Sequence, residues 1–275
     1  MQVGGGRLHY VEQGSGPPLV LFHGAAYLHG DMSKGPLGAR LRRRYRCISF
    51  DRPGHGYSSE YPFHMAPQHQ ADLLREAVRR LGIQRPILMG HSFGGAVALA
   101  YAARYPDEVA GVVTLAPQAF PKATAATVGF GLLGLLQGLP VLNRTISPVL
   151  GRMGMGKVIE EAFRPQKVPR SFLAATPAGL LARPVQIRST SQEILTDLPS
   201  MAALPRQYRL IRAPMATIAG TGDIVLDAHD QAERLARTVP GTQLHLLPGL
   251  GHMLHYFAPD IVMSALDEVR DRAGL

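Results

Sequence analysis

One serine of the chain stands in a setting that could make it a nucleophile. Ser92 is the central residue of Gly90-His91-Ser92-Phe93-Gly94, which fits the G-x-S-x-G pattern of a strained turn between a strand and a helix, the nucleophile elbow. A serine hydroxyl attacks poorly near neutral pH unless a base takes its proton and a third group orients that base. The alternative is an ordinary glycine-rich turn with an incidental serine, so the rest of the chain has to supply the partners.

Two residues further along lie where such partners are needed. Asp223 follows the apolar segment 215–219, and His252 follows the apolar segment 243–247. Because the carboxyl ends of parallel strands meet at one edge of a sheet, side chains there can converge with Ser92. His252 is expected to act as general base, and Asp223 is expected to fix the imidazole tautomer and stabilise its cation, which completes a catalytic triad.

Backbone N–H groups are expected to stabilise the oxyanion that forms when the serine attacks a carbonyl. The donors of this oxyanion hole are predicted to be Phe93, the residue after the serine, and Ala25, in the loop that follows an apolar strand. The side chains expected to line an apolar substrate pocket are Tyr27, Leu28, Phe93 and Met253.

The other histidines compete less well for a role in catalysis. His255 is the one serious rival base, whereas His91 is the variable position of the elbow and His55 lies in a loop that favours a role in backbone shape. No group of His, Cys, Asp and Glu has the spacing of metal ligands, and no glycine-rich loop fits a phosphate or dinucleotide fingerprint. The sequence therefore predicts no metal and no cofactor.

The elements that must position these residues alternate regularly in two parts of the chain. Continuous apolar runs are typical of strands buried on both faces of a parallel sheet, and amphipathic segments separate them. The predicted strands are 7–13, 19–22, 45–50, 87–89, 109–115, 215–219 and 243–247, and the predicted helices are 67–81, 96–103, 228–237 and 259–272. This alternation predicts an α/β fold with a mostly parallel, doubly wound sheet.

The alternation stops between the two parts. Residues 118–205 are rich in proline and show no clear buried strand, so they are predicted to form a helical cap inserted into a core made of 1–117 and 206–275. Residues 123–143 carry no charge and are just long enough to raise the question of a membrane span. Their glycines and polar residues favour a cap helix over an apolar pocket instead.

Composition indicates a globular protein. The 275 residues, 46% of them hydrophobic, can bury a large core without a disulfide, and Cys47 in its apolar run is predicted to be a buried structural thiol. The formal net charge is +9, but the arginines are scattered; the one dense run, 40–46, favours a solvated helix end over an anionic partner. We therefore expect no nucleic-acid partner, and the oligomeric state stays open.

The start of the chain lacks the apolar segment of a signal peptide, so a cytoplasmic location is expected.

In combination these motifs resemble those of the α/β-hydrolase superfamily. The matching stretches are His23-Gly24, Asp51-Arg52-Pro53-Gly54-His55-Gly56-Tyr57-Ser58, Gly90-His91-Ser92-Phe93-Gly94-Gly95, Gly222-Asp223 and Gly251-His252. The resemblance covers about residues 7–117 and 206–275. It implies an α/β-hydrolase fold with Ser92 as nucleophile, Asp223 as acid, His252 as base, and Ala25 and Phe93 as oxyanion donors. Epoxide hydrolases and haloalkane dehalogenases of this superfamily carry Asp at the nucleophile position, so the resemblance argues against both activities.

The function expected first is that of a serine esterase: cofactor-independent hydrolysis of a small, largely apolar carboxylic ester through an acyl-serine intermediate. A carbon–carbon bond hydrolase or a perhydrolase would use the same triad, and Arg183 or Arg188 could then bind the carboxylate of a ring-cleavage product. A ligand receptor of the same fold with slow turnover, and a membrane-anchored enzyme that uses 123–143, are the remaining alternatives.

Overall fold

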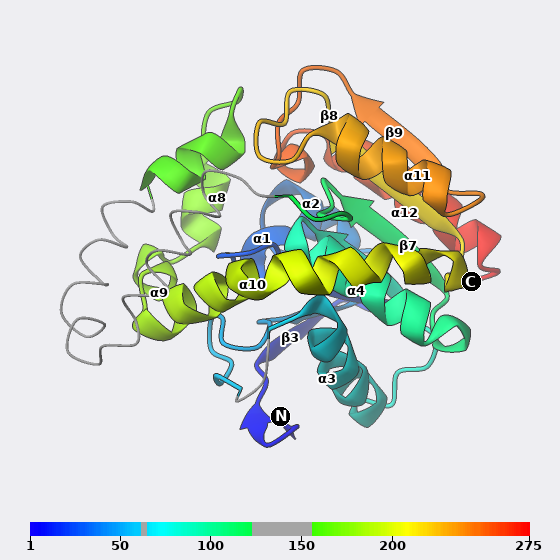
Figure 1. Ribbon diagram of the computed structural model, residues 1–275, viewed down its shortest axis with the longest axis horizontal. Coiled ribbons are helices and arrows are strands. Elements are labelled where there is room, and N and C mark those ends of the chain that lie inside the picture. The colour runs from blue at the N-terminus through cyan, green and yellow to red at the C-terminus, as the bar shows by residue number, and fades with distance from the viewer. Residues whose placement is uncertain (62–64, 123–155) are drawn as a thin grey trace.

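The computed structural model describes residues 1–61, 65–122 and 156–275 (Figure 1). A small hairpin pairs β1 (Gln2–Val3) with β2 (Gly6–Arg7). The main sheet has seven strands: β3 (Tyr10–Gln13), β4 (Pro18–Phe22), β5 (Arg46–Phe50), β6 (Ile87–His91), β7 (Gly111–Leu115), β8 (Met215–Gly220) and β9 (Gln243–Leu247). The strand predicted over 7–13 is therefore divided, because Arg7 pairs within the hairpin and the edge strand begins at Tyr10.

The main sheet is parallel except at one edge, which confirms the predicted mostly parallel, doubly wound sheet. Its order is β3-β5-β4-β6-β7-β8-β9, and only β3 pairs antiparallel, with β5. Val20 in β4 pairs with Ile48 on one side and Leu88 on the other. The strand order thus reverses at β4, and ligands of open α/β sheets bind beyond the strand ends at such a point. The loop after β4 and the elbow after β6 meet there.

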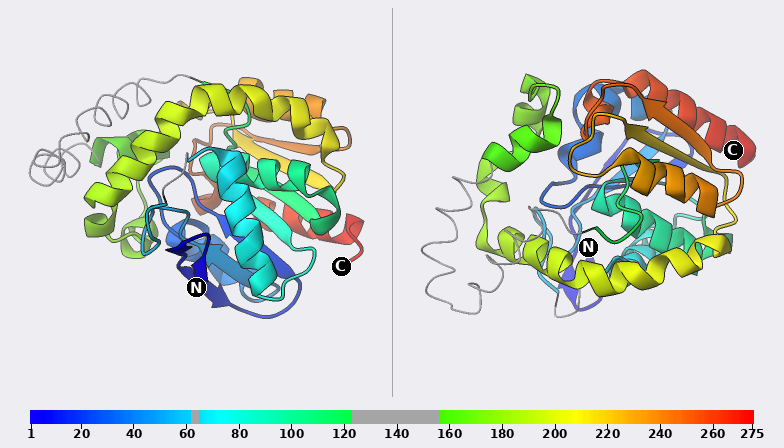
Figure 2. Two further views of the ribbon diagram at one scale, coloured as in Figure 1. Left: turned by 60° about the horizontal axis from the view of Figure 1, so that its bottom comes forward. Right: turned by 45° about the horizontal axis from the view of Figure 1, so that its top comes forward.

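Helices cover both faces of the sheet (Figures 1 and 2). They are α1 (Gly30–Ser33), α2 (Gly35–Leu41), α3 (Pro67–Arg80), α4 (Phe93–Arg104), α11 (Arg234–Thr238) and α12 (Pro259–Arg272). Alternate strand residues point to opposite faces: Val20 and Phe22 join the core under α3 and α4, whereas Leu19 and Leu21 join the core under α2 and α12. These two apolar layers hold the strand ends in place.

Shorter helical turns lie between these elements, namely η1 (Pro106–Glu108), η2 (Leu204–Leu210), the π-helical η3 (His229–Glu233) and η4 (Leu254–Tyr256). The single helix predicted over 228–237 is thus a π-helical turn followed by α11. The helix predicted over 259–272 is confirmed as α12.

Several helices lie among the described residues between β7 and β8. Residues 156–163 form one helix, followed by α8 (Arg170–Ala175), α9 (Ala178–Leu181) and the long α10 (Pro184–Ala203). Helix α10 crosses the molecule in Figure 1 and continues into η2, which packs on α4. The cap boundaries at 118 and 205 stay a prediction.

The candidate membrane segment 123–143 lies outside the described residues. Within the described ranges, no helix combines the length and the apolar character needed to cross a membrane.

Arginines of the dense run form ion pairs with neighbouring acidic residues. Nε of Arg40 lies 2.8 Å from Oδ1 of Asp260, and Nε of Arg46 lies 2.7 Å from Oε1 of Glu12. Cys47, at the start of β5, is buried, and burial raises the pKa of its thiol to about 12. The thiol is therefore protonated near neutral pH, in keeping with a structural role.

Candidate active site

Ser92 occupies a strained backbone position between β6 and α4. Its φ is 52° and its ψ is −121°, a conformation that costs a residue with a Cβ about 1–3 kcal/mol. Neighbouring backbone holds it there. The N–H of Ser92 donates to the carbonyl of Leu115 at the end of β7 (2.9 Å), and its carbonyl accepts from Gly95 (2.9 Å) and Gln118 (3.0 Å). This is the geometry expected of a nucleophile elbow.

The elbow requires glycine where two backbones pass closely. A Cβ on Gly94 would lie 2.1 Å from the carbonyl oxygen of Phe22 in β4. Across the same gap, a Cβ on Gly24 would lie 3.2 Å from Cβ of Ser92 and 3.1 Å from Nδ1 of His91. The loop after β4 therefore packs directly against the elbow.

Asp223 and His252 form a buried pair at the ends of β8 and β9. Oδ2 of Asp223 lies 2.7 Å from Nδ1 of His252, and Oδ1 accepts the N–H groups of Val225 (2.8 Å) and Leu226 (2.9 Å). Burial alone would raise the pKa of Asp223, but His252 and the two N–H groups outweigh burial and lower it. The carboxylate is thus ionised near neutral pH and can orient the imidazole.

The structure places this pair beside the elbow. The ring of His91, the residue before Ser92, lies 4.9 Å from the ring of His252, and Nε2 of His91 lies 3.2 Å from the carbonyl oxygen of His252. Within the described part of the chain, neither Oγ of Ser92 nor Nε2 of His252 has a hydrogen-bond partner. Catalytic hydrogen bonds often tighten only when substrate binds, so the three predicted triad residues stand as a candidate triad.

The rival base, His255, is engaged elsewhere. Its Nε2 lies 3.1 Å from Oδ1 of Asp31, and Nδ1 of His91 lies 2.8 Å from Oδ2 of the same carboxylate. Asp31, His91 and His255 are all fully buried. Asp223 therefore orients His252, whereas Asp31 serves the other two histidines.

The predicted oxyanion donors lie at the elbow and in the loop beside it. Phe93 is the first residue of α4, where the N–H has no acceptor within the helix. Ala25 directly follows Gly24. Among the described residues neither N–H finds a protein acceptor, so both are available for an oxyanion.

Arg52 holds the backbone just before Ala25. Its Nε donates to the carbonyl of His23 (2.8 Å) and its Nη2 donates to the carbonyl of Gly24 (3.0 Å). Nε2 of His23 accepts the N–H of Arg52 (2.9 Å), and its Nδ1 lies 2.8 Å from the Gly24 carbonyl. Burial lowers the pKa of His23 well below 6.5, which keeps its ring neutral for this pattern.

The same guanidinium binds the long helix α10, which lies within the predicted cap segment 118–205. Arg52 pairs with both carboxylate oxygens of Glu193 in α10, and both side chains are fully buried. Gln70 in α3 accepts from Arg52 (2.8 Å) and donates to Glu193 (2.9 Å). The guanidinium of Arg52 therefore joins helix α10, helix α3 and the loop after β4.

The four predicted pocket residues are buried but do not act alike. Tyr27 and Met253 join one apolar cluster with Phe163 and Phe172 from the 118–205 segment. Phe93 belongs instead to the main core, with the Arg52 guanidinium 5.0 Å from its ring centre. Leu28 is buried as well. None of the four lines the cavity of about 390 Å³ near the N-terminus, so their role in substrate binding stays a prediction.

Two groups of histidine and carboxylate that sequence spacing did not indicate are assembled by the fold. They are His9 with His29 and Asp51, and Asp31 with His91 and His255. In each group the ligand-type atoms lie within 4.8 Å of one another. Either could hold a cation in principle, and the first is partly accessible.

The match to known proteins agrees with this fold. A family model described as alpha/beta hydrolase fold matches residues 17–259. The chain therefore belongs to the alpha/beta hydrolase family.

Individual relatives are distant and chemically varied. Haloalkane dehalogenase 2 of Mycobacterium bovis is 28% identical over 280 residues, which cover 96% of this chain and 91% of that protein. A bacterial membrane phospholipase A has a similar structure, with a TM-score of 0.77 at 24% identity over 98% of this chain and 86% of the other. A thermophilic esterase from Thermogutta terrifontis gives a TM-score of 0.69 at 23% identity, over 98% and 94% of the two chains. The structural likenesses show the fold alone.

Sequence reasoning missed the residues that support the site from behind. Asp31 lies in no motif, and nothing near Glu193 indicates that it pairs with Arg52. Arg52 belongs to the motif 51–58 that resembles the α/β-hydrolase superfamily, and this motif was the one sequence signal for its importance. Its buried contacts, however, join segments that lie far apart in the chain.

Proposed function

We propose that the protein is a serine hydrolase that cleaves a small, largely apolar carboxylic ester through an acyl-Ser92 intermediate. The observation that carries the proposal is the strained elbow at Ser92 beside the buried Asp223–His252 pair. The elbow exposes the Ser92 hydroxyl, and the Asp223–His252 pair can take its proton. Ester hydrolysis by a serine nucleophile needs these two features and no cofactor.

In the proposed reaction, Nε2 of His252 takes the proton of Ser92 as Oγ attacks the ester carbonyl. The N–H groups of Ala25 and Phe93 stabilise the oxyanion of the tetrahedral intermediate. His252 then gives the proton to the leaving alcohol, which departs and leaves the acyl-enzyme. Water, deprotonated by His252, releases the acid and restores the Ser92 hydroxyl.

The identity of the nucleophile supports an acyl substrate over a haloalkane. A carboxylate that displaces halide forms an ester, and water can later cleave that ester at its carbonyl. A serine alkoxide that displaced halide would form an ether, which has no carbonyl for water to attack. Although one relative is named a haloalkane dehalogenase, Ser92 supports ester chemistry for this chain.

The contacts of two arginines weaken the case for a substrate with a carboxylate. Arg183 donates to the carbonyl of Gly56, and Arg188 pairs with Glu60 at 3.0 Å. Both were candidate anchors for a ring-cleavage product, yet each already serves a protein acceptor. These contacts bear on the carbon–carbon hydrolase and do not concern the perhydrolase. Both activities stay alternatives to be tested.

The proposal is tested with p-nitrophenyl esters of increasing acyl length. We expect sustained turnover by the wild type and a loss of roughly 10⁴-fold or more in kcat for Ser92→Ala. Ser49→Ala is the matched control, because the buried Ser49 hydroxyl has no hydrogen-bond partner in the described structure and its removal should leave activity intact.

Other outcomes distinguish the alternatives. Equal turnover by wild type and Ser92→Ala contradicts the proposal. Faster cleavage of a vinylogous diketone than of any ester favours the carbon–carbon hydrolase, and faster oxidation of a halide with peroxide and acetate favours the perhydrolase. A single burst without further turnover favours a receptor.

A further inference from the structure

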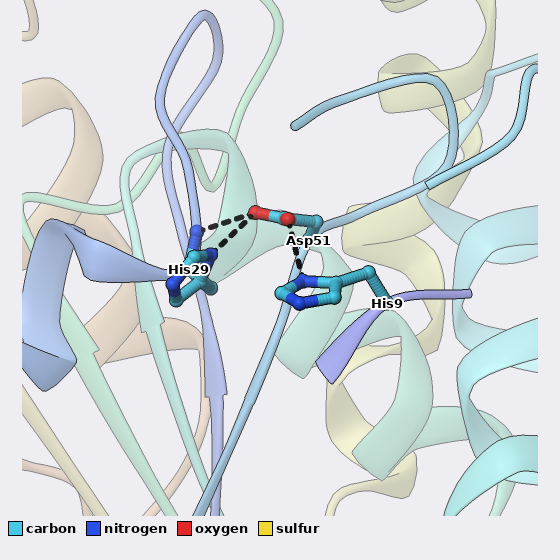
Figure 3. Close-up of side chains that lie close together, drawn as sticks. All are labelled: His9, His29 and Asp51. Carbon is cyan, nitrogen blue, oxygen red and sulfur yellow. Dashed lines mark hydrogen bonds and ion pairs between the residues drawn. The ribbon is translucent and has the colours of Figure 1, made fainter. Parts of the chain in front are cut away.

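A second cluster of reactive side chains lies apart from the candidate triad. It joins His9, just before β3, His29, just before α1, and Asp51, just after β5 (Figure 3). None of these residues belongs to the proposed triad or oxyanion hole. The three segments come from separate parts of the chain, so the cluster exists only in the folded protein.

The carboxylate of Asp51 is held rigidly by backbone. Its Oδ1 accepts the N–H of His29 (2.8 Å), and its Oδ2 accepts the N–H of Tyr57 (3.0 Å). A carboxylate oxygen has two lone pairs, so one on each oxygen remains. These two face the imidazoles.

Both imidazoles turn the same atom toward that carboxylate (Figure 3). Nδ1 of His9 lies 2.8 Å from Oδ2, and Nδ1 of His29 lies 3.0 Å from Oδ1. Metal bonds to nitrogen and oxygen of about 2.0–2.2 Å place neighbouring ligand atoms roughly 3 to 3.5 Å apart. The two nitrogen–oxygen distances in the cluster are close to that range, and all of its ligand-type atoms lie within 4.8 Å of one another.

We propose that His9, His29 and Asp51 form a binding site for a divalent first-row transition cation such as Zn²⁺ or Co²⁺. Two imidazole nitrogens and one carboxylate suit these ions better than Mg²⁺ or Ca²⁺, which prefer oxygen ligands alone. The cation replaces the proton on Nδ1 of each neutral ring, and each ring then carries its proton on Nε2. The backbone N–H groups that hold Asp51 orient the carboxylate ligand.

One of the three proposed ligands lines a cavity. A cavity of about 390 Å³ is lined by His9 and Tyr57, together with Met1, Arg7, Leu8 and Tyr10. The His9 side chain is 32% exposed, and its ring lies 5.0 Å from that of Tyr57. A cation can therefore approach the cluster from the side of His9, whereas the Asp51 side chain is fully buried.

Binding would have a structural consequence. The cation would cross-link the N-terminal segment, the loop after β4 and the motif loop after β5. A ligand that binds only the folded state raises the free energy of unfolding by RT ln(1 + L/Kd), where L is the concentration of free ligand. Cation binding should therefore raise the melting temperature of the whole chain.

The test uses the full-length protein, dialysed against a chelator and then titrated with Co²⁺ while its visible absorption is recorded. We expect a saturable absorption band at one equivalent per chain and a higher melting temperature. His9→Phe keeps an aromatic ring beside Tyr57 and should weaken Co²⁺ binding by at least about tenfold. His229→Phe is the matched control, because His229 is 69% exposed and remote from the cluster in sequence.

Three results would overturn the proposal. The first is no saturable Co²⁺ band in the wild type, which leaves Asp51 as a hydrogen-bonded structural residue only. The second is unchanged binding by His9→Phe and by His29→Phe, each checked for its fold by circular dichroism. The third is binding that is lost in His255→Phe but kept in His9→Phe, which assigns the cation to the buried Asp31 cluster instead.

Discussion

Asp223 and His252 are joined by a contact of 2.7 Å between Oδ2 and Nδ1, and almost no surface of either side chain reaches solvent. The second oxygen of Asp223 accepts two backbone N–H groups. The carboxylate thus has one orientation, and it presents one oxygen to the imidazole. In the proposed reaction this leaves Nε2 of His252 as the nitrogen that accepts the serine proton.

The first prediction follows from that orientation. Asp223→Asn should lower kcat for ester hydrolysis by roughly 10⁴-fold, because the amide favours the wrong imidazole tautomer and no longer stabilises its cation. The fold should persist, since the amide oxygen can still accept from Val225 and Leu226. Asp227→Asn, in an exposed turn nearby, is the control. Full activity of Asp223→Asn would exclude this residue as the acid.

The second prediction concerns the contact between the loop after β4 and the elbow. A Cβ on Gly24 would lie 3.1 to 3.2 Å from Ser92, His91 and Tyr27. Gly24→Ala should therefore displace the reacting groups and lower kcat by up to about 10²-fold. Gly179→Ala adds the same methyl group where no atom lies within 4 Å and should leave kcat unchanged. Steady-state kinetics of both variants test this prediction. An unchanged kcat for Gly24→Ala would show that the loop accommodates the added methyl group without displacing the reacting groups.

The third prediction concerns the buried ion pair between Arg52 and Glu193. Glu193→Gln leaves the Arg52 cation buried without its partner and should lower the free energy of unfolding by about 3–5 kcal/mol. Arg52→Met combined with Glu193→Gln should lose less than the sum of Arg52→Met and Glu193→Gln made singly, because no unpaired charge remains. Denaturant unfolding of the four proteins measures the coupling. Additive losses would mean that the two charges act independently.

The fourth prediction is a pH dependence of stability. Burial lowers the pKa of His91 from 6.5 to about 4, although the Asp31 carboxylate opposes the shift. Between these values the unfolded chain binds the proton and the folded chain does not, so stability falls as pH falls from 6.5 to 4. Over this pH range, His91 should lower the free energy of unfolding by about 3 kcal/mol.

His91→Asn keeps an N–H near the position of Nδ1 but cannot titrate. Its free energy of unfolding should therefore decline less steeply than that of the wild type over this pH range, measured by denaturant unfolding at several pH values. His229→Asn, at an exposed site, should follow the wild type. Parallel curves for His91→Asn and wild type would show that His91 takes up no proton on unfolding.

The fold and the candidate triad were predictable because their signals are local. A buried parallel strand is a short apolar run, and the residues just after such runs meet at one sheet edge. Ser92 directly follows β6, and Asp223 and His252 lie in the loops that begin where β8 and β9 end, so the predicted strands indicated where to look for them. The elbow added a five-residue pattern that depends only on backbone geometry.

The contacts that support the site were not predictable, because they join residues that lie far apart in the sequence. His9, His29 and Asp51 come from three loops, and no spacing between them repeats that of known metal ligands. Glu193 meets Arg52 across 141 positions of sequence. Such pairings depend on how whole layers pack, and the sequence pattern around each residue does not record its distant partner.

The insertion between β7 and β8 has a consequence for how the protein can change over time. Leu115 pairs with Ile218, so adjacent strands of one sheet are joined by a connection of roughly a hundred residues. The entropic cost of closing such a connection grows only with the logarithm of its length, so doubling the length costs about 0.6 kcal/mol. The sheet and the proposed chemistry can therefore stay constant while the insertion is lengthened, shortened or exchanged. Under the prediction that the insertion caps the substrate pocket, substrate choice can then evolve separately from catalysis.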